Sequence, residues 1–343
     1  SAASDVYKRQ GYDRTRTALT DELTAEGAEI TYDDAAELIP GYCRDKATTL
    51  VVYTPAVPST HPGLTYFRDG GFDVMKRAQV LGLLTHDSKG LCFSGTHGKT
   101  TTSSMAAHIL HSSEIGCNAF LGGILRNYDS NFMLSPTSPY TVIEADEFDR
   151  SFHWLNPYIA VVTATDPDHL DIYGTHEAVK EAFAQFISQI KAGGALVLKL
   201  GVDVAVRNDA IKVWRYSYDE PCDFYAKNVE LIGGGHYRYD MVTPSGVVEG
   251  CTLGVPGWIN IENSVAAVAA FWCAAKAEGK PFDEDALRSA LAEFSGVKRR
   301  FEFYVNTPKQ VYMDDYAHHP RELSATIASV RKMFPGRRLT AIF

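Results

Sequence analysis

A short run rich in glycine, lysine and threonine carries the clearest chemical signal in this sequence. Its residues are Gly95, Thr96, His97, Gly98, Lys99, Thr100 and Thr101. Glycines let backbone N–H groups turn toward phosphate oxygens, the lysine can reach the outer phosphates, and a hydroxyl beside the lysine can bind Mg²⁺. The longer pattern GxxxxGK[ST] would need glycine where the chain has Phe93. The run therefore predicts an ATP site with a shortened phosphate loop and Thr100 as the first Mg²⁺ ligand.

The residues on either side of this loop predict the elements that must position it. Apolar residues at 91–93 indicate a strand, and Met105, Ile109 and Leu110 follow at helical spacing. A glycine–lysine–threonine run alone could be an ordinary turn before a helix. The flanking pattern favours nucleotide binding, because the positive end of the following helix would face the phosphates.

Two further polar segments follow predicted strands of the same sheet. The acidic run 144–147, which begins with Glu144, follows a strand at 140–143, and His169 follows a strand at 158–163. Ligands of parallel sheets bind at the carboxyl ends of strands, so we expect these segments to lie beside each other at one edge. The acidic run could also be a solvated loop, and the histidine a structural residue. With the phosphate loop, they predict a two-metal phosphoryl-transfer site.

Length, composition and charge limit the class of protein. A chain of 343 residues suits two or three domains, and 45% hydrophobic with 22% charged residues is typical of a soluble globular protein without a membrane span. The net charge of −9 offers no basic stripe for nucleic acid. The six cysteines lack CxxC spacing, which indicates thiols in a reducing cytoplasm.

The order of predicted elements divides the chain into a tail and three α/β parts. Residues 1–10 resemble an extraneous tail, and residues 11–87 alternate short helices and strands. Residues 88–298 carry the phosphate loop, a mostly parallel sheet and an antiparallel patch, while residues 299–343 begin another part with a strand from Leu339. The first and last parts lack strands that a closed core needs, which predicts truncation at both ends.

Six motifs in one order make the chain resemble the Mur ligase family. They are GTHGKTTT, EADEFD, DPDHLDIYGT, the helix start at Asn260, GVKRRFE from Gly296, and DDYAHHP from Asp314. The resemblance runs from about residue 11 to 343. It implies a three-domain α/β architecture: a Rossmann-like domain for a UDP-sugar, a central P-loop ATPase domain, and a Rossmann-like domain that closes over them.

The resemblance also implies an activity, with ATP and Mg²⁺ as cofactors. ATP would phosphorylate the lactyl carboxylate of UDP-N-acetylmuramate, and L-alanine would attack the acyl phosphate, in a cytoplasmic step of peptidoglycan synthesis. Three alternatives stay open: a ligase that recycles a preformed peptide, a folylpolyglutamate synthase, and a nucleotide-binding module without ligase activity. The DPDHLDIYG segment argues against the first and DDYAHHP against the second.

The same resemblance implies roles for individual residues around the phosphates. Thr100 and Glu144 match ligands of the Mg²⁺ that bridges the β- and γ-phosphates, and His169 matches a ligand of a second ion. Lys99 would neutralise charge on the phosphates during transfer. Lys99, Glu144 and His169 are therefore the expected catalytic residues of the central domain.

Other implied roles lie at the ends of the nucleotide and on the substrate side. Asn260 and Asn263 match residues near adenine, although the family usually has histidine where this chain has Ile259. Arg299 and Arg300 match a hinge pair for phosphate or carboxylate, with a solvated charge pair as the alternative.

Three residues are expected to bind substrates. Tyr316 and His318 resemble residues on the amino-acid side, which reach the site when the C-terminal domain closes; His318 would also be catalytic. Asp13 matches the acidic residue that meets a ribose or base in Rossmann-like domains. A place in a helix N-cap region is its alternative.

Overall fold

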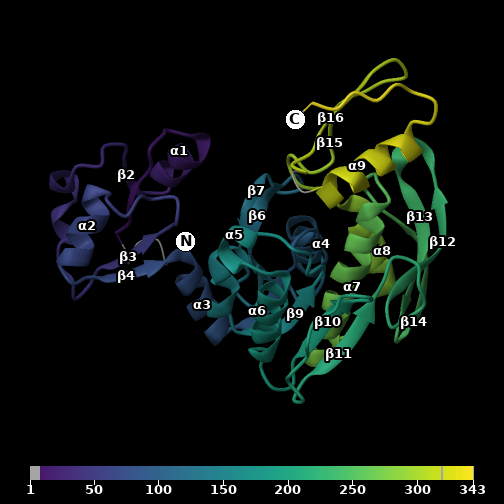
Figure 1. Ribbon diagram of the computed structural model, residues 1–343, viewed down its shortest axis with the longest axis horizontal. Helices are drawn as coiled ribbons and strands as arrows, with labels where there is room; N and C mark the ends of the chain where they lie inside the picture. Colours follow the sequence, from purple (N-terminus) through teal and green to yellow (C-terminus); the bar gives the residue numbers. More distant parts are fainter. Residues whose placement is uncertain (1–7, 318–319, 343) are drawn as a thin grey trace. The chain divides into compact units, whose positions relative to one another are not determined.

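The structure, a computed structural model, describes residues 8–317 and 320–342 (Figure 1). The chain separates into two compact units, one up to Val80 and the other from Leu81. Both units combine helices with parallel strand pairs. Among the described residues, none of the helices combines the length and hydropathy that a membrane crossing requires.

The first unit contains two parallel strand pairs with connecting helices. In chain order its elements are β1 (Gln10–Tyr12), α1 (Ala18–Ala25), β2 (Glu29–Thr31), η1 (Ala36–Leu38), η2 (Gly41–Cys43), β3 (Leu50–Tyr53), α2 (Pro62–Asp69) and β4 (Asp73–Lys76). β1 pairs with β2, and β3 pairs with β4. The predicted tail extended too far, because Gln10 pairs with Glu29 in the first ladder and the Arg9 carbonyl accepts the Glu29 N–H.

A seven-stranded sheet organises the second unit, in the order β11-β10-β9-β5-β8-β6-β7. The strands are β5 (Lys89–Ser94), β6 (Asn118–Leu125), β7 (Ser130–Met133), β8 (Tyr140–Glu144), β9 (Pro157–Val162), β10 (Ala195–Lys199) and β11 (Lys212–Tyr216). Every neighbouring pair is parallel except β6 with β7. The central strands are buried on both faces, which is why they are continuous apolar runs in the sequence.

Helices cover both faces of this sheet (Figure 1). On one face lie α4 (Lys99–His111) and α7 (Ile259–Glu278), and on the other α3 (Arg77–Asp87) from Leu81 onward, η3 (Phe148–Trp154), α5 (Leu170–Tyr173) and α6 (His176–Ser188). Successive side chains of β5 alternate between the two cores: Leu91 and Phe93 belong to the first, Cys92 to the second. This packing fixes the carboxyl ends of the strands, where the predicted site residues lie.

The remaining elements of the second unit lie outside this sheet. They are β12 (Tyr225–Leu231), η4 (Gly233–Gly235), β13 (Tyr237–Thr243), β14 (Gly246–Thr252), α8 (Glu284–Glu293), β15 (Glu302–Asn306), β16 (Val311–Asp314) and α9 (Pro320–Met333). β12, β13 and β14 form the predicted antiparallel patch, which packs on α7 and α8. The strand predicted from Leu339 is wrong: residues 337–342 are irregular, and no strand of the described chain pairs with them.

Candidate functional site

The carboxyl ends of β5, β8 and β9 bring most of the predicted residues to one cleft. Its volume is about 280 Å³. The lining residues are Thr96, His97, Gly98, Lys99, Thr100, Thr101, Glu144, Asp146, Glu147, Phe148, Asp168, His169, Arg300, Tyr316 and Glu322. The acidic and histidine loops are neighbours, as expected, because His169 Nε2 lies 4.0 Å from Glu147 Oε1, although β5 separates their strands β8 and β9. The phosphate loop therefore occupies the middle of the site.

The backbone of the phosphate loop is held in a shape that requires glycine. Gly95 has a φ of 141°, and a Cβ there would lie 2.0 Å from Thr163 Oγ1 on the neighbouring strand end. The same hydroxyl donates to the carbonyl of His97 at 2.5 Å. Gly98 is the N-cap of α4 and has no side chain to accept from the first-turn amides. These amides can therefore bind an anion.

The Lys99 ammonium is already surrounded by acceptors. Its Nζ donates to the Gly95 carbonyl at 2.9 Å and to both carboxylate oxygens of Glu147 at 2.8 Å, and it lies 3.7 Å from Asp146. Burial lowers the pKa of Lys99, but the carboxylates of Glu147 and Asp146 outweigh burial and raise the pKa above its ordinary value. Lys99 is therefore a charged group at neutral pH.

Thr100 and Glu144 form the pair expected to bind a cation. Thr100 Oγ1 donates to Glu144 Oε1 at 2.9 Å, and the Gly122 N–H donates to Glu144 Oε2 at 3.1 Å. Burial raises the pKa of Glu144, while the Lys99 charge and the Thr100 hydroxyl oppose that rise. A hydroxyl and a carboxylate oxygen side by side are ligands that Mg²⁺ prefers. The donor chemistry at this position thus fits the ion.

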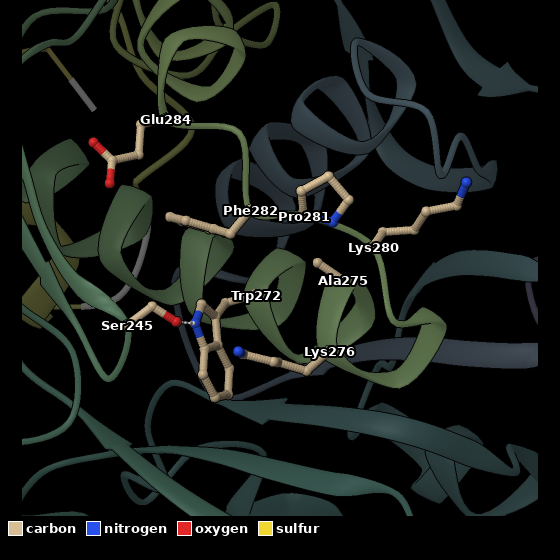
Figure 2. A pocket seen from close by; sticks show the side chains of 8 residues that line it. All are labelled: Ser245, Trp272, Ala275, Lys276, Lys280, Pro281, Phe282 and Glu284. Carbon is tan, nitrogen blue, oxygen red and sulfur yellow. Dashed lines mark hydrogen bonds between the residues drawn. The ribbon is translucent and has the colours of Figure 1, made fainter.

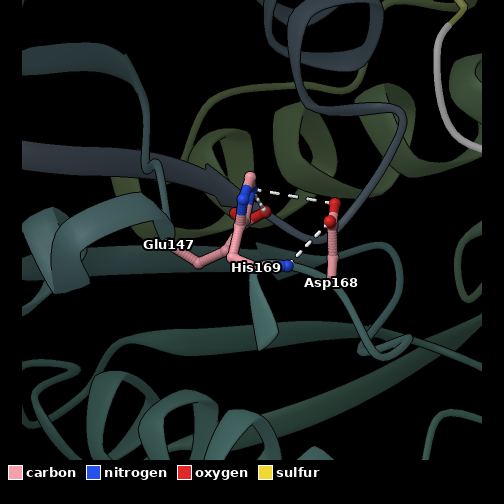
Figure 3. Close-up of side chains that lie close together, drawn as sticks. All are labelled: Glu147, Asp168 and His169. Atoms are coloured by element: carbon pink, nitrogen blue, oxygen red, sulfur yellow. Dashed lines mark hydrogen bonds and ion pairs between the residues drawn. The ribbon is translucent and has the colours of Figure 1, made fainter. Parts of the chain in front are cut away.

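A second group of donors surrounds His169 (Figure 3). His169 Nε2 lies 4.0 Å from Glu147 Oε1 and 3.7 Å from Asp168 Oδ2, and the three residues offer ligand atoms within 4.8 Å of one another. The backbone of His169 is left-handed, with a φ of 51°. Such outliers are often found at functional sites.

Glu147 and Asp168 were not among the predicted site residues. Asp168 directly precedes His169, and Glu147 ends the acidic run. Their positions in these motifs could therefore have indicated that both belong to the site. The sequence could not reveal that the Glu147 side chain is only 1% exposed. It also could not show that β5 lies between β8 and β9, because strand order depends on contacts between distant segments.

The two asparagines expected near adenine lie beside the first turns of α4. Asn263 Oδ1 accepts from Thr102 Oγ1 at 3.2 Å, and Asn263 Nδ2 donates to Asn260 Oδ1 at 3.1 Å. Asn260 Nδ2 in turn donates to the Pro256 carbonyl at 2.7 Å. The structure brings both asparagines together at the start of α7; their contact with adenine stays a prediction.

The predicted hinge arginines differ in their surroundings. Arg300 Nη2 lies 3.4 Å from Thr100 Oγ1, and Arg300 lines the cleft. Arg299 instead pairs with Asp314 at 3.4 Å, with 63% of its side chain exposed. Both guanidinium groups lie 5.2 Å from the ring of Tyr316, which also lines the cleft. The structure thus places Arg300 and Tyr316 in the cleft at the phosphate loop, and Arg299 is not among the lining residues.

Two predicted residues are not part of this cleft as described. His318 lies outside the described residues. Asp13 belongs to the first unit, where its Oδ1 accepts the N–H of Thr15 at 2.9 Å, while the N-cap of α1 is Thr17. The carboxylate therefore stabilises the turn that leads into the helix, and its role toward a UDP-sugar stays a prediction.

A second cavity has a similar size but different chemistry (Figure 2). Its volume is about 300 Å³. Trp272 Nε1 donates to Ser245 Oγ at 2.8 Å, and the Lys276 ammonium lies 5.3 Å from the Trp272 ring. None of the predicted site residues lines it. The cleft at the phosphate loop is therefore the better candidate for the functional site.

A glycine-rich loop between a buried parallel strand and a helix, with carboxylates on both sides, defines an α/β nucleotide-binding protein. Family models match the chain at three places: "Mur ligase family, catalytic domain" at residues 2–89, "Mur ligase middle domain" at 93–271, and "Mur ligase, glutamate ligase domain" at 299–343. The chain belongs to the Mur ligase family. It is therefore a ligase, and the predicted α/β architecture of that family is confirmed.

Individual relatives agree with this assignment. The UDP-N-acetylmuramate--L-alanine ligase of Phocaeicola vulgatus is 53% identical over 335 residues, which cover 97% of this chain and 71% of that protein. The crystal structure of UDP-N-acetylmuramate-alanine ligase from Thermotoga maritima matches with a TM-score of 0.76 at 24% identity, covering 95% of this chain and 72% of that one. A murein peptide ligase from Psychrobacter arcticus matches with a TM-score of 0.72 at 22% identity, covering 98% and 73%. These two likenesses concern the fold.

Proposed function

We propose that this protein uses ATP to ligate L-alanine to the lactyl carboxylate of UDP-N-acetylmuramate, a cytoplasmic step of peptidoglycan precursor synthesis. The observation that carries the proposal is the meeting of the Lys99 ammonium and the Thr100–Glu144 pair at one phosphate loop. The name of the Phocaeicola vulgatus relative, at 53% identity, supports the choice of substrates. The free cysteines are compatible with a reducing compartment.

The residues of the cleft divide the work of phosphoryl transfer. The first-turn amides of α4 and the Lys99 ammonium would bind the phosphates, and Arg300 would add a second positive charge beside Thr100. Thr100 and Glu144 would hold one Mg²⁺ and His169 a second. When bound, Mg²⁺ supplies neutralisation of phosphate charge. Together these groups would let a carboxylate approach a polyanion.

Carboxylates outnumber cationic side chains in the cleft, which supports the need for a divalent cation. Five carboxylates line the cleft with Lys99 and Arg300: Glu144, Asp146, Glu147, Asp168 and Glu322. This excess of negative charge would repel a nucleotide triphosphate unless cations arrived with it. Asn260 and Asn263 are proposed to meet adenine, and Tyr316 the amino-acid side.

The deciding experiment is phosphate release from ATP with Mg²⁺ and UDP-N-acetylmuramate, measured with and without L-alanine. We expect release that depends on L-alanine. A parallel reaction replaces L-alanine by a preformed peptide that begins with L-alanine, because the murein peptide ligase fold is nearly as similar. Release with the peptide alone would identify a recycling ligase. Nucleotide binding without release in either reaction would leave only a nucleotide-binding module.

Matched variants test the residue assignment. Thr100→Val removes the hydroxyl but keeps the shape, and Glu144→Gln removes the charge; both should abolish alanine-dependent release. Asp149→Asn removes a charge from the same loop at an exposed position outside the cleft lining and serves as the control. Normal turnover in Thr100→Val or Glu144→Gln would contradict the proposed cation site.

A further inference from the structure

The Lys99 ammonium uses all its hydrogen-bond donors within the protein. An ammonium group has three N–H donors. The Gly95 carbonyl and the two oxygens of Glu147 accept them at 2.9, 2.8 and 2.8 Å. A phosphate oxygen can therefore bind Lys99 only if one of these acceptors gives way. The Gly95 carbonyl is fixed in the loop backbone, so the acceptor that can change partner is the Glu147 side chain.

Glu147 is a buried carboxylate with a fixed backbone. Its side chain is 1% exposed, and its backbone carbonyl accepts from Tyr173 OH at 2.5 Å. Burial raises the pKa of the Glu147 carboxyl, and the Lys99 ammonium opposes that rise. A buried charge that loses its partner is strongly destabilised. Glu147 can thus release Lys99 only when another cation takes the place of the ammonium.

The side of Glu147 that faces His169 offers that place. His169 Nε2 lies 4.0 Å from Glu147 Oε1, and Asp168 completes a group of donors within 4.8 Å (Figure 3). An imidazole nitrogen and two carboxylates are suitable ligands for a divalent cation. The same carboxylate therefore contacts the phosphate-binding lysine and borders the donors of a cation.

We propose that Glu147 is a positioning residue that withholds Lys99 from the γ-phosphate until a divalent cation replaces the ammonium as its partner. This inference rests on the proposed nucleotide site and adds a coupling to it. Without the cation, the γ-phosphate gains little from Lys99 and is repelled by the neighbouring carboxylates. With the cation, Lys99 turns to the phosphate.

The first test uses the unaltered protein and calorimetric titration with ADP and with AMP-PNP, an ATP analogue that is not hydrolysed readily. In EDTA, we expect the affinities for the two nucleotides to differ by less than about fivefold. The reason is that a lysine that stays bonded to Glu147 adds little binding energy for the γ-phosphate. In Mg²⁺, AMP-PNP should bind at least about tenfold tighter than ADP. A larger preference in EDTA, or a smaller one in Mg²⁺, would overturn the proposal.

The second test removes the charge of Glu147 while keeping its shape. In Glu147→Gln, AMP-PNP should bind about tenfold tighter than in the unaltered protein in EDTA, and the gain from Mg²⁺ should shrink by a similar factor. Asp149→Asn, in the same loop but exposed, should change either affinity by less than about twofold. Thermal unfolding of both variants is measured to check that they are folded.

A purely structural role for Glu147 predicts a different pattern. Glu147→Gln would then weaken AMP-PNP binding equally in EDTA and in Mg²⁺, and that result would refute the coupling. These titrations contain neither sugar nor amino acid. A failure of alanine-dependent phosphate release would therefore contradict the proposed ligase reaction and leave the titration results unchanged. A failure to bind any nucleotide would contradict both the ligase reaction and the coupling.

Discussion

Replacing Gly122 by alanine should disable the proposed cation site without altering any of its ligands. A Cβ at Gly122 would lie 2.1 Å from Glu144 Oε2 and 2.7 Å from Glu144 Cδ. These atoms form the end of a flexible side chain, so the carboxylate will turn away before β6 deforms. Gly122 is not among the glycines with positive φ, so its backbone accepts alanine.

The size of the effect follows from the two hydrogen bonds that hold the carboxylate. The Gly122 N–H and Thr100 Oγ1 donate to it at 3.1 and 2.9 Å. Hydrogen bonds to charged groups contribute about 1.5–3 kcal/mol each, so losing one and weakening the other costs about 3 kcal/mol. If that loss falls on the transition state, kcat/KM decreases about 150-fold. The lost hydrogen bonds also belong to the folded state, so the free energy of unfolding should fall by up to about 3 kcal/mol, partly offset because alanine suits a strand better than glycine.

The assay is alanine-dependent phosphate release, with thermal unfolding measured on the same preparations. Gly233→Ala is the matched control, because a Cβ there meets nothing within 4 Å. Activity of Gly122→Ala within about fivefold of the unaltered protein would refute the reasoning that the Gly122 amide fixes Glu144. If Gly122→Ala is already partly unfolded at the temperature of the assay, its loss of activity would show a folding defect instead.

Three further predictions concern residues other than Gly122 and Glu144: Lys99, Lys191 and Glu278. Lys99→Ala should reduce phosphate release at least about 100-fold in the same assay, because the phosphates lose their nearest cation; release within tenfold would contradict this. Lys191→Met should lower the free energy of unfolding in urea by about 2–4 kcal/mol while nucleotide affinity stays unchanged, because the Lys191 ammonium donates to three backbone carbonyls at the end of α3. The Lys89 ammonium, 2.6 Å away, together with Tyr140 lowers the pKa of Glu278 below 4.5. This stabilisation is present above pH 4.5 and disappears as the pH falls through the lowered pKa, so Glu278→Gln should cost about 1 kcal/mol at pH 7 in urea unfolding and progressively less as the pH falls through that pKa.

Local patterns were sufficient to predict the phosphate loop and its flanking elements. β5 and α4 follow from a continuous apolar run and from helical spacing, and both depend on residues close together in sequence. The antiparallel patch was also predictable, because the buried Tyr237, Tyr239 and Met241 alternate with less buried residues. Thr100 lies in the first turn of α4 and Glu144 at the end of β8, and the structure confirms that the two meet.

The features that the sequence did not predict depend on contacts between distant segments. The sequence did not predict β6, whose extension past β8 brings the Gly122 amide to Glu144, because paired glycines are not typical of a strand. The sequence did not predict Glu147 as a site residue, because its side chain becomes buried and pairs with Lys99 only when the loops after β5 and β8 meet. Strand order is a global property, and the local pattern carries little information about it.

The cleft is assembled from chain segments that are far apart in sequence, from Thr96 to Glu322. Parallel strands joined by crossovers pair late, since long loops must close before their contacts stabilise the chain. A partly folded molecule should therefore lack the nucleotide site altogether. Nucleotide added during refolding would leave the early steps unaffected and would stabilise only the finished product. Binding competence can accordingly serve as a late marker of folding, to be compared with the early appearance of helical circular dichroism.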